Sequence, residues 1–278
     1  MNNKTNSITT EHLDIAYDEA LIVKALDMNI PHGKITSIIG PNGCGKSTVL
    51  KAIGRILKPK SGMVYLSGED IRQLSTKDIA KKMAILPQTP TAPSGLTVSE
   101  LVAYGRFPHQ RGFGKLTPED KKIVQWALSV TKLTEFEHRE VDTLSGGQRQ
   151  RVWIAMALAQ QTDLILLDEP TTYLDLAHQL EVLELLYDLN RRQNCTIAMV
   201  LHDLNLAARF SDYMIAIRGG SIIKHGNPGE VMTAEVLSDA FSIDAQIVHE
   251  PRTGRPVCLT YDLLRTQALP ITEEAVAV

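Results

Sequence analysis

The sequence has few of the features that mark membrane-spanning, secreted or nucleic-acid-binding proteins. None of its apolar runs approaches the roughly 18 residues that a bilayer span requires. Residues 1–10 are polar and contain no apolar segment of the kind found in secretory signals. Its 29 basic and 32 acidic residues give a net charge of -3, so the basic footprint of proteins that bind a nucleic-acid backbone is missing. We therefore expect no nucleic-acid partner.

Cysteines and aromatic residues are also scarce. The 278 residues include three cysteines, without metal-ligand spacing, which we interpret as reduced thiols rather than as a disulfide framework. Aromatic residues make up 5% of the chain, too few for extended stacking platforms. Hydrophobic residues at 44% and charged residues at 22% are typical of a globular protein that buries a sizeable core.

Short apolar runs alternate with helical patterns along the chain. The runs at residues 35–39, 164–167 and 196–201 are typical of buried strands, and a helical pattern follows each of them. These helical patterns cover residues 46–57, 176–192 and 204–210. Because strands that alternate with helices form parallel βαβ units, the sequence predicts a doubly wound α/β fold.

The middle of the chain breaks this alternation. From about residue 89 to residue 160 there are helical patterns, including residues 98–104 and 118–130, but no strong strand. We interpret this stretch as a helical subdomain inserted into the α/β core. Further on, residues 213–218 and 221–225 predict a hairpin around two glycines.

The domain organisation follows from these patterns. We predict one domain over residues 8–250 and a short C-terminal extension over residues 251–278. Residues 1–10 are polar and residues 268–278 lack clear turn and cap signals, so we expect both ends to be poorly ordered.

The strongest local signal is a glycine-rich loop between a predicted strand and a predicted helix. It fits the pattern G-x4-G-K-[ST] with Gly40, Pro41, Asn42, Gly43, Cys44, Gly45, Lys46, Ser47 and Thr48. In such a loop the backbone N–H groups surround an anion at the positive end of a helix dipole. Lys46 is then expected to reach the β- and γ-phosphates of a nucleotide, and the hydroxyl of Ser47 to bind Mg²⁺. ATP and Mg²⁺ are the ligands that this loop predicts.

Two acidic residues follow the apolar run at residues 164–167. We expect Asp168 to hold Mg²⁺ through water and Glu169 to accept a proton from the attacking water. A strand that ends in a polar turn would show the same two residues, so this interpretation depends on the phosphate loop upstream.

A second glycine turn opens another helix. It consists of Leu144 followed by Ser145, Gly146, Gly147 and Gln148. By the same physics this turn can bind an anion, although a serine N-cap with two permissive glycines has the same composition. A chain with one phosphate loop has no evident need for a second phosphate site.

Together these three segments resemble the ATP-binding subunits of ABC transporters. The resemblance covers about residues 13–249 and implies a P-loop α/β core with an inserted helical subdomain and an antiparallel β subdomain. It also implies an ATP hydrolase that dimerises head to tail, each ATP lying between the phosphate loop of one copy and the LSGGQ segment of the other. A two-fold dimer of this kind makes its two sites identical.

The resemblance assigns roles to four further residues. Gln88 occupies the position of the glutamine that contacts Mg²⁺ and the attacking water, and His202 that of the histidine that contacts the γ-phosphate. Asp175 matches the loop that couples the two sites. Tyr17 matches the aromatic residue that stacks on adenine, although a half-buried strand tyrosine is an alternative there.

One position departs from the commonest family pattern. Cys44 stands where serine or alanine is frequent, and only its backbone N–H is needed there. We expect its side chain to face the phosphate loop, so that modification of the thiol blocks nucleotide binding.

Two segments narrow the resemblance. Residues 102–110 and 172–181 look like those of the importer group for ferric siderophores, cobalamin and haem. The resemblance implies a dimeric or two-subunit permease, a periplasmic or lipid-anchored substrate-binding protein, and a peripheral location on the cytoplasmic side of the cell membrane. We expect residues 104–110 to shape the permease-docking groove, with Arg106 or Phe107 as the contact.

Other function classes are considered alongside import. A soluble ABC ATPase that acts on nucleic acid or ribosomes usually has two cassettes, long coiled insertions or zinc cysteines, which this sequence lacks. A P-loop kinase does not explain the LSGGQ segment. An exporter subunit remains open, since the permease sets the direction of transport.

Overall fold

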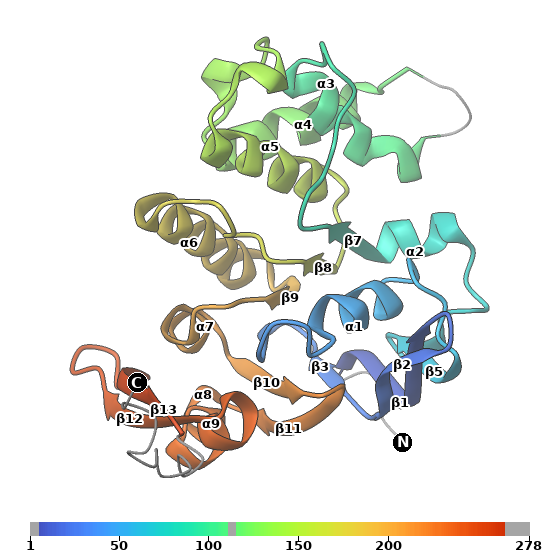
Figure 1. Cartoon of the computed structure of the whole chain (residues 1–278). Helices are drawn as coiled ribbons and strands as arrows, with labels where there is room; N and C mark the ends of the chain where they lie inside the picture. Colours follow the sequence, from blue (N-terminus) through green and yellow to red (C-terminus); the bar gives the residue numbers. More distant parts are fainter. Residues whose placement is uncertain (1–5, 111–114, 265–278) are drawn as a thin grey trace, which may run out of the picture.

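The computed structural model describes residues 6–110 and 115–264, and its arrangement is shown in Figure 1. The strands are β1 (Asn6–Tyr17), β2 (Ala20–Leu26), β3 (Asn29–Pro31), β4 (Ile35–Ile39), β5 (Ser61–Leu66), β6 (Glu69–Asp70), β7 (Met83–Leu86), β8 (Leu164–Leu167), β9 (Thr196–Val200), β10 (Tyr213–Arg218), β11 (Ser221–Gly226), β12 (Ile243–His249) and β13 (Pro256–Leu263). The α-helices are α1 (Lys46–Ile53), α2 (Thr76–Lys82), α3 (Val98–Ala103), α4 (Pro118–Val130), α5 (Gly146–Ala159), α6 (Leu176–Gln193), α7 (Leu204–Phe210), α8 (Pro228–Val231) and α9 (Ala234–Phe241). Three 3₁₀ turns are η1 (Tyr104–His109), η2 (Thr134–Phe136) and η3 (Val141–Thr143).

A mainly parallel sheet forms the centre of the molecule. Its strands run in the order β11-β10-β4-β9-β8-β7, in which β10, β4, β9, β8 and β7 are parallel and β11 pairs antiparallel with β10. Strands β4, β8 and β9 are buried along their whole length, which explains their continuous apolar sequences. The predicted α/β fold is confirmed.

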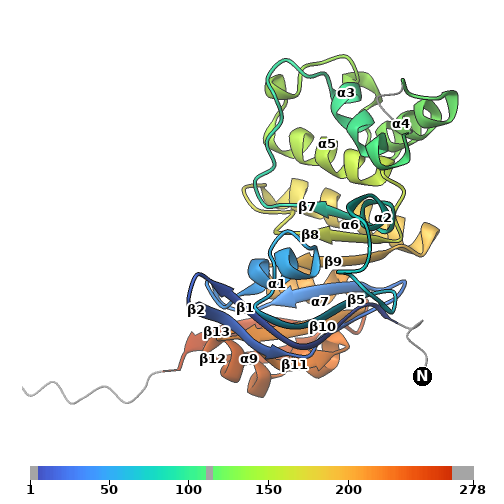
Figure 2. The ribbon, with the colours of Figure 1, turned by 90° about the vertical axis from the view of Figure 1, so that its right-hand side faces the viewer.

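An antiparallel sheet built from the N-terminal third covers one side of α1. Its strands run in the order β2-β1-β5-β6, and β3 also pairs with β1. Apolar residues of this sheet, of α1 and of the parallel sheet share one hydrophobic core, so α1 lies between the two sheets (Figure 2). The phosphate loop that precedes α1 is therefore held from both sides.

The expectation of disorder at residues 1–10 is wrong for residues 6–10, which form the start of β1. Ile8 is fully buried and pairs with both Leu66 and Ile30. Thr10 is also buried, and its hydroxyl donates to the carbonyl of Leu26 at 2.7 Å. The strand is not apparent from the sequence because its polar side chains are buried and form hydrogen bonds within the antiparallel sheet, as Thr10 does. Residues 1–5 and 268–278 lie outside the described residues.

The inserted helices form a lobe of their own above the parallel sheet (Figure 1). Three of them begin with a capping box, in which the N-cap side chain and the N3 side chain bond to each other's backbone N–H. The pairs are Thr97 with Glu100, Thr117 with Asp120, and Ser145 with Gln148. These local signals explain why α3, α4 and α5 begin where the sequence predicts.

The C-terminal hairpin joins the predicted domain and the predicted extension. Strands β12 and β13 pair antiparallel from Ile243 opposite Leu263 to His249 opposite Pro256. The predicted boundary at residues 250 and 251 falls in the turn between these strands. Cys258 on β13 is buried and its backbone N–H donates to Asn205 of α7 at 2.8 Å. Residues 256–258, the first of β13, therefore pack against the predicted domain, whereas residues 259–263 are exposed.

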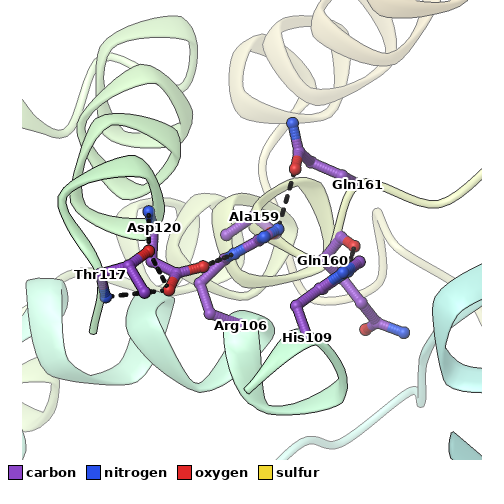
Figure 3. Close-up of polar contacts among 7 residues, drawn as sticks. All are labelled: Arg106, His109, Thr117, Asp120, Ala159, Gln160 and Gln161. Carbon is purple, nitrogen blue, oxygen red and sulfur yellow. Dashed lines mark hydrogen bonds and ion pairs between the residues drawn. The ribbon is translucent and has the colours of Figure 1, made fainter. Parts of the chain in front are cut away.

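The prediction that Arg106 contacts a permease is wrong, because this side chain is buried inside the helical lobe (Figure 3). Its Nε donates to Asp120 at 2.8 Å, and its Nη1 donates to the carbonyl of Ala159 at 2.7 Å and to Gln161 at 3.0 Å. Arg106 thus joins η1 to the start of α4 and to the end of α5. Phe107, the alternative contact, is 58% exposed.

The Cys44 side chain lies against the phosphate loop, as predicted, since a Cβ atom built on Gly40 would lie 2.8 Å from its Sγ, but the thiol is buried and not open to modification from solvent. Cys44 is 5% exposed and belongs to the core between the two sheets, on the inner side of the phosphate loop. Burial raises the pKa of its thiol, although the nearby Lys46 opposes this. Cys195 and Cys258 are buried as well, and burial raises the pKa of Cys195 to about 11.

Replacing Arg106 with leucine is expected to lower the free energy of unfolding by about 3 kcal/mol, because the substitution leaves Asp120 buried without its ionic partner. Urea denaturation followed by circular dichroism measures this. Arg192→Leu is the matched control, since Arg192 and Asp188 form an exposed pair at 3.6 Å and the expected loss is below about 0.5 kcal/mol. Equal losses in the two variants would contradict a structural role for Arg106.

The contribution of the Arg106–Asp120 pair to the free energy of unfolding is also expected to depend on pH. Hydrogen bonds from Thr117, opposed by burial and helped by Arg106, lower the pKa of Asp120 from 3.8 to about 2. A lowered folded-state pKa stabilises the protein above the unfolded value, and this stabilisation is lost as the pH falls from about 4 to about 2. The stability difference between the parent and Arg106→Leu should therefore narrow in that range.

The thiol of Cys44 is expected to react slowly with iodoacetamide in the folded protein. Because the thiol is buried and its pKa is raised, the native rate should be at least about 100-fold below the rate in urea. Mass spectrometry of timed samples measures both rates. Cys44→Ala should keep nucleotide affinity, and rapid labelling of native Cys44 would show that the side chain is accessible.

Candidate functional site

The candidate site lies at the carboxyl edge of the parallel sheet. Strands β4, β9, β8 and β7 are neighbours in this order, so the segments that follow them meet at one edge. These segments contain the phosphate loop after β4, His202 after β9, Asp168 and Glu169 after β8, and Gln88 after β7. Residues from Gly40 to His202 are thereby assembled into one site.

The phosphate loop leaves the start of α1 open to a ligand. Gly45 is the N-cap residue with φ of 102°, a conformation that glycine adopts without strain, and no side chain caps the first turn. The N–H groups of this turn are free to bind an anion, which the helix dipole also favours. A side chain at Gly40 would collide with the carbonyl oxygen of Ile217, so the loop also depends on close contact with β10.

Lys46 carries its charge at the mouth of the loop. The residue is 5% exposed, and its Nζ donates to the carbonyls of Gly40 and Pro41 at 2.9 Å each. These bonds compensate the ammonium group for its burial. They also hold a positive charge beside the open N-terminus of α1, as the sequence predicts for a phosphate ligand.

Ser47 and Asp168 are in direct contact, as expected for two groups that share a metal ion. The Ser47 hydroxyl donates to Oδ1 of Asp168 at 2.7 Å, and Asp168 is 3% exposed. Burial raises the pKa of Asp168, and the bond from Ser47 only partly opposes this. A buried carboxylate with incomplete compensation beside a hydroxyl oxygen fits the oxygen ligands that Mg²⁺ prefers.

Glu169 is surrounded by side chains that bond to its carboxylate. His202 Nε2 lies 2.7 Å from Oε1, while Gln88 Nε2 at 2.5 Å and the Thr172 hydroxyl at 3.0 Å donate to Oε2. Burial raises the pKa of Glu169, but the bonds from His202 and Thr172 outweigh this effect, so the pKa lies below its ordinary value. The carboxylate is therefore ionised at neutral pH and can accept a proton.

A cavity of about 710 Å³ opens at this edge of the sheet. Of the predicted residues it is lined by Tyr17, Asn42, Gly43, Gly45, Lys46, Ser47, Thr48, Gln88, Glu169 and His202. Ile22, Thr172 and Tyr173 also line it and were not predicted as site residues. The position of Thr172, three residues after Glu169, and its hydroxyl could have indicated a site residue. No local sequence pattern indicates that Ile22 or Tyr173 lines the cavity. Tyr17 is 45% exposed at the end of β1, as a residue that stacks on a flat ligand requires.

The LSGGQ segment is not part of this cavity. Ser145, Gly146, Gly147 and Gln148 begin α5 in the helical lobe, and none of them lines the cavity. Ser145 Oγ accepts from the N–H of Gln148 at 3.3 Å, and the N–H of Ser145 donates to the Gln148 side chain at 3.0 Å. The segment is thus a capped helix start that lies apart from the residues lining this cavity.

Two further properties concern only residues 6–110 and 115–264. They contain no group of three or more histidine, cysteine or acidic residues placed to hold a metal ion. No helix in these ranges is both long enough and apolar enough to cross a membrane.

The sequence matches the family model of ABC transporters over residues 23–172. It is 62% identical to the iron(3+)-hydroxamate import ATP-binding protein FhuC of Bacillus subtilis, over 96% of this chain and 99% of that protein. It is 46% identical to the ferric enterobactin transport ATP-binding protein FepC of Escherichia coli, over 89% of this chain and 91% of that protein.

Solved structures give the same result. A chain of a metal-chelate type ABC transporter in an inward-facing conformation has a TM-score of 0.79 and 30% identity, covering 95% of this chain and all of that chain. The ABC transporter cassette MJ0796, solved as a dimer, has a TM-score of 0.71 and 31% identity, covering 79% of this chain and 98% of the other. With its phosphate loop, its acidic pair and these similarities, the chain belongs to the ATP-hydrolysing, ATP-binding subunits of ABC transporters.

Proposed function

We propose that this ATPase subunit energises the import of an iron–siderophore complex through a membrane permease. The observation that carries the proposal is the 62% identity, over nearly the whole of both chains, with an iron(3+)-hydroxamate import ATP-binding protein. Two other relatives, each 50% identical, are named as ATP-binding proteins of siderophore transport and of petrobactin import. Their names support the same class of cargo. Cobalamin or haem import is the alternative within this group.

Different residues of the cavity bind different parts of MgATP in this proposal. The N–H groups at the start of α1 and the ammonium of Lys46 hold the phosphates, and Tyr17 stacks on the adenine. Ser47, Asp168 and Gln88 would hold Mg²⁺, which would neutralise phosphate charge and polarise the reacting phosphoryl group. Their oxygen-bearing side chains fit this ion, and Ser47 already contacts Asp168 at 2.7 Å.

Glu169 acts as the general base in this proposal. Its lowered pKa keeps the carboxylate ionised, so it can take the proton of the attacking water. Gln88 and His202 hold the carboxylate from both oxygens, which fixes its direction. Both side chains also line the cavity, so Gln88 is proposed to contact the attacking water as well, and His202 the γ-phosphate.

A head-to-tail dimer completes the site. The LSGGQ segment does not line its own chain's cavity, so it is available to the ATP of a second copy. Tyr173, which lines the cavity, is 87% exposed, and Leu176, three residues further on, is 68% exposed, so both are accessible to a second copy. We assign both to the interface with a second copy.

The permease is proposed to dock on η1. Tyr104 and Phe107 stack at 4.8 Å between ring centres and are 37% and 58% exposed, so they offer a preformed aromatic surface. Arg106 and His109 fix this turn to the end of α5 (Figure 3). Docking there makes the subunit a peripheral protein on the cytoplasmic side of the membrane, with a substrate-binding protein serving the permease from outside.

Glu169→Gln is expected to bind MgATP but to hydrolyse it at least about 10²-fold more slowly, because an amide cannot accept the proton. It should also accumulate as an ATP-bound dimer. Phosphate release and size-exclusion chromatography measure the two effects. Glu119→Gln, an exposed residue of α4, is the control and should keep parental activity. Near-parental hydrolysis by Glu169→Gln would show that another group is the base.

Phe107→Ala is expected to leave ATP binding unchanged and to weaken assembly with the permease, because it removes half of the exposed aromatic pair. Leu259→Ala, which also removes an exposed apolar side chain, is the control and should assemble normally. Co-purification with the permease and growth on a ferric hydroxamate as the only iron source measure the effect.

Two outcomes would contradict parts of this proposal. Full assembly and growth of the Phe107→Ala strain would contradict docking on η1. Normal growth of a deletion strain on ferric siderophores, with a defect when cobalamin or haem must be imported, would instead favour the alternative cargo.

A further inference from the structure

His178 lies one turn into α6 and contacts the LSGGQ segment of its own chain. Gly147 is buried, and a Cβ atom built on it would lie 2.6 Å from Cδ2 and 3.0 Å from Cγ of the His178 ring. The imidazole therefore occupies the space in which any other residue at 147 would place its side chain. The backbone of Gly147 is helical, a conformation that every residue type can adopt, so backbone conformation does not require glycine here. The reason for glycine is the ring that packs on it.

The ring is held in place from the loop that follows Glu169. Asp175 is the N-cap of α6, and its Oδ1 accepts from the backbone N–H of His178 at 2.9 Å. The same oxygen bonds Nδ1 of the ring at 2.8 Å. One carboxylate thus fixes the start of α6 and the orientation of the imidazole, so the ring cannot turn away from Gly147 without breaking a bond.

A second contact one turn further along both helices supports this register. Arg151 of α5 and Glu181 of α6 form an ion pair at 3.7 Å, and the Arg151 side chain is 16% exposed. Positions 147 and 151 face positions 178 and 181, because residues three or four apart share one side of a helix. Helices α5 and α6 lie next to each other in both views (Figures 1 and 2).

We propose that His178 is a positioning residue that sets the LSGGQ segment for the ATP of the second copy. The inference rests on the proposed function of this segment in the dimer. Asp175 orients the ring, the ring supports Gly147, and Gly147 lies in the first turn of α5 between Ser145 and Gln148. Loss of the ring leaves the segment present but displaced, and small displacements of binding groups cost large factors in rate.

The test is a double-mutant cycle between positions 147 and 178, made with the full chain. His178→Ala should lower kcat/KM at least about tenfold, while the affinity of the monomer for MgATP stays within about twofold, because the phosphate loop is untouched. His178→Asn, which can still bond to Asp175 but lacks the ring, should behave like His178→Ala. His138→Ala, an exposed histidine of the helical lobe, is the control and should keep full activity.

Gly147→Ala alone should lower activity strongly, because its methyl group collides with the ring. In Gly147→Ala with His178→Ala the collision is gone, so activity should exceed the product of the two single effects by about fivefold or more. Strictly multiplicative effects would overturn the proposal, as would parental activity of His178→Ala. If the melting temperature fell equally in all variants and the activity of the double variant did not exceed the product of the two single effects, the contact would be merely structural.

The role of the segment itself is tested separately with Ser145→Arg. This variant should keep monomer affinity for MgATP and lose the dimer that Glu169→Gln accumulates. If it still forms that dimer, the proposed role of LSGGQ fails. The coupling between Gly147 and His178 is measured independently of that result, so the two failures are distinguishable.

Discussion

The parallel pairing of β4, β9 and β8 is the constraint on which the site depends. Because Ile38 lies beside Val200 and Leu167 beside Met199, the three strands end at the same level of the sheet. The phosphate loop, the acidic pair and His202 each follow one of these strands directly. A slip of one residue in a parallel pair would move a functional side chain to the other face of the sheet.

Charge at this edge is arranged in compensated pairs that a ligand can join. Lys46 is satisfied by two carbonyls of its own loop, and Glu169 by Gln88, Thr172 and His202. Asp168 is the exception, since Ser47 offsets its burial only in part. The group with incomplete compensation is the one proposed to hold the cation. In this way the residues that are satisfied without ligand are also those proposed to bind MgATP.

Helix α5 connects the functional regions of the helical lobe. At its C-terminal end Arg106 and His109 donate to the carbonyls of Ala159 and Gln160, which ties the aromatic turn η1 to the helix. Its N-terminal end is the LSGGQ segment, against which His178 packs. A single helix of 14 residues therefore links the aromatic turn η1 to the segment proposed to contact the second ATP.

The sequence by itself determined the helices, strands and loops whose positions are marked by local sequence signals. A helical pattern indicated α4, a serine N-cap with two glycines indicated the start of α5, the apolar runs indicated β4, β8 and β9, and the glycine loop indicated the phosphate site. The family resemblance supplied Gln88, His202 and Tyr17, all of which line the cavity.

Tertiary structure decided what depends on neighbours distant in the sequence. Strand β1 was missed because its polar residues are satisfied inside the antiparallel sheet. Arg106 was misplaced because the buried Asp120 that neutralises it lies 14 residues away on another helix. The direction of the Cys44 side chain is fixed by the packing of the loop between two sheets, and local sequence does not encode it. Sequence determines which chemical groups are available, whereas burial and long-range pairing decide which of them face a ligand.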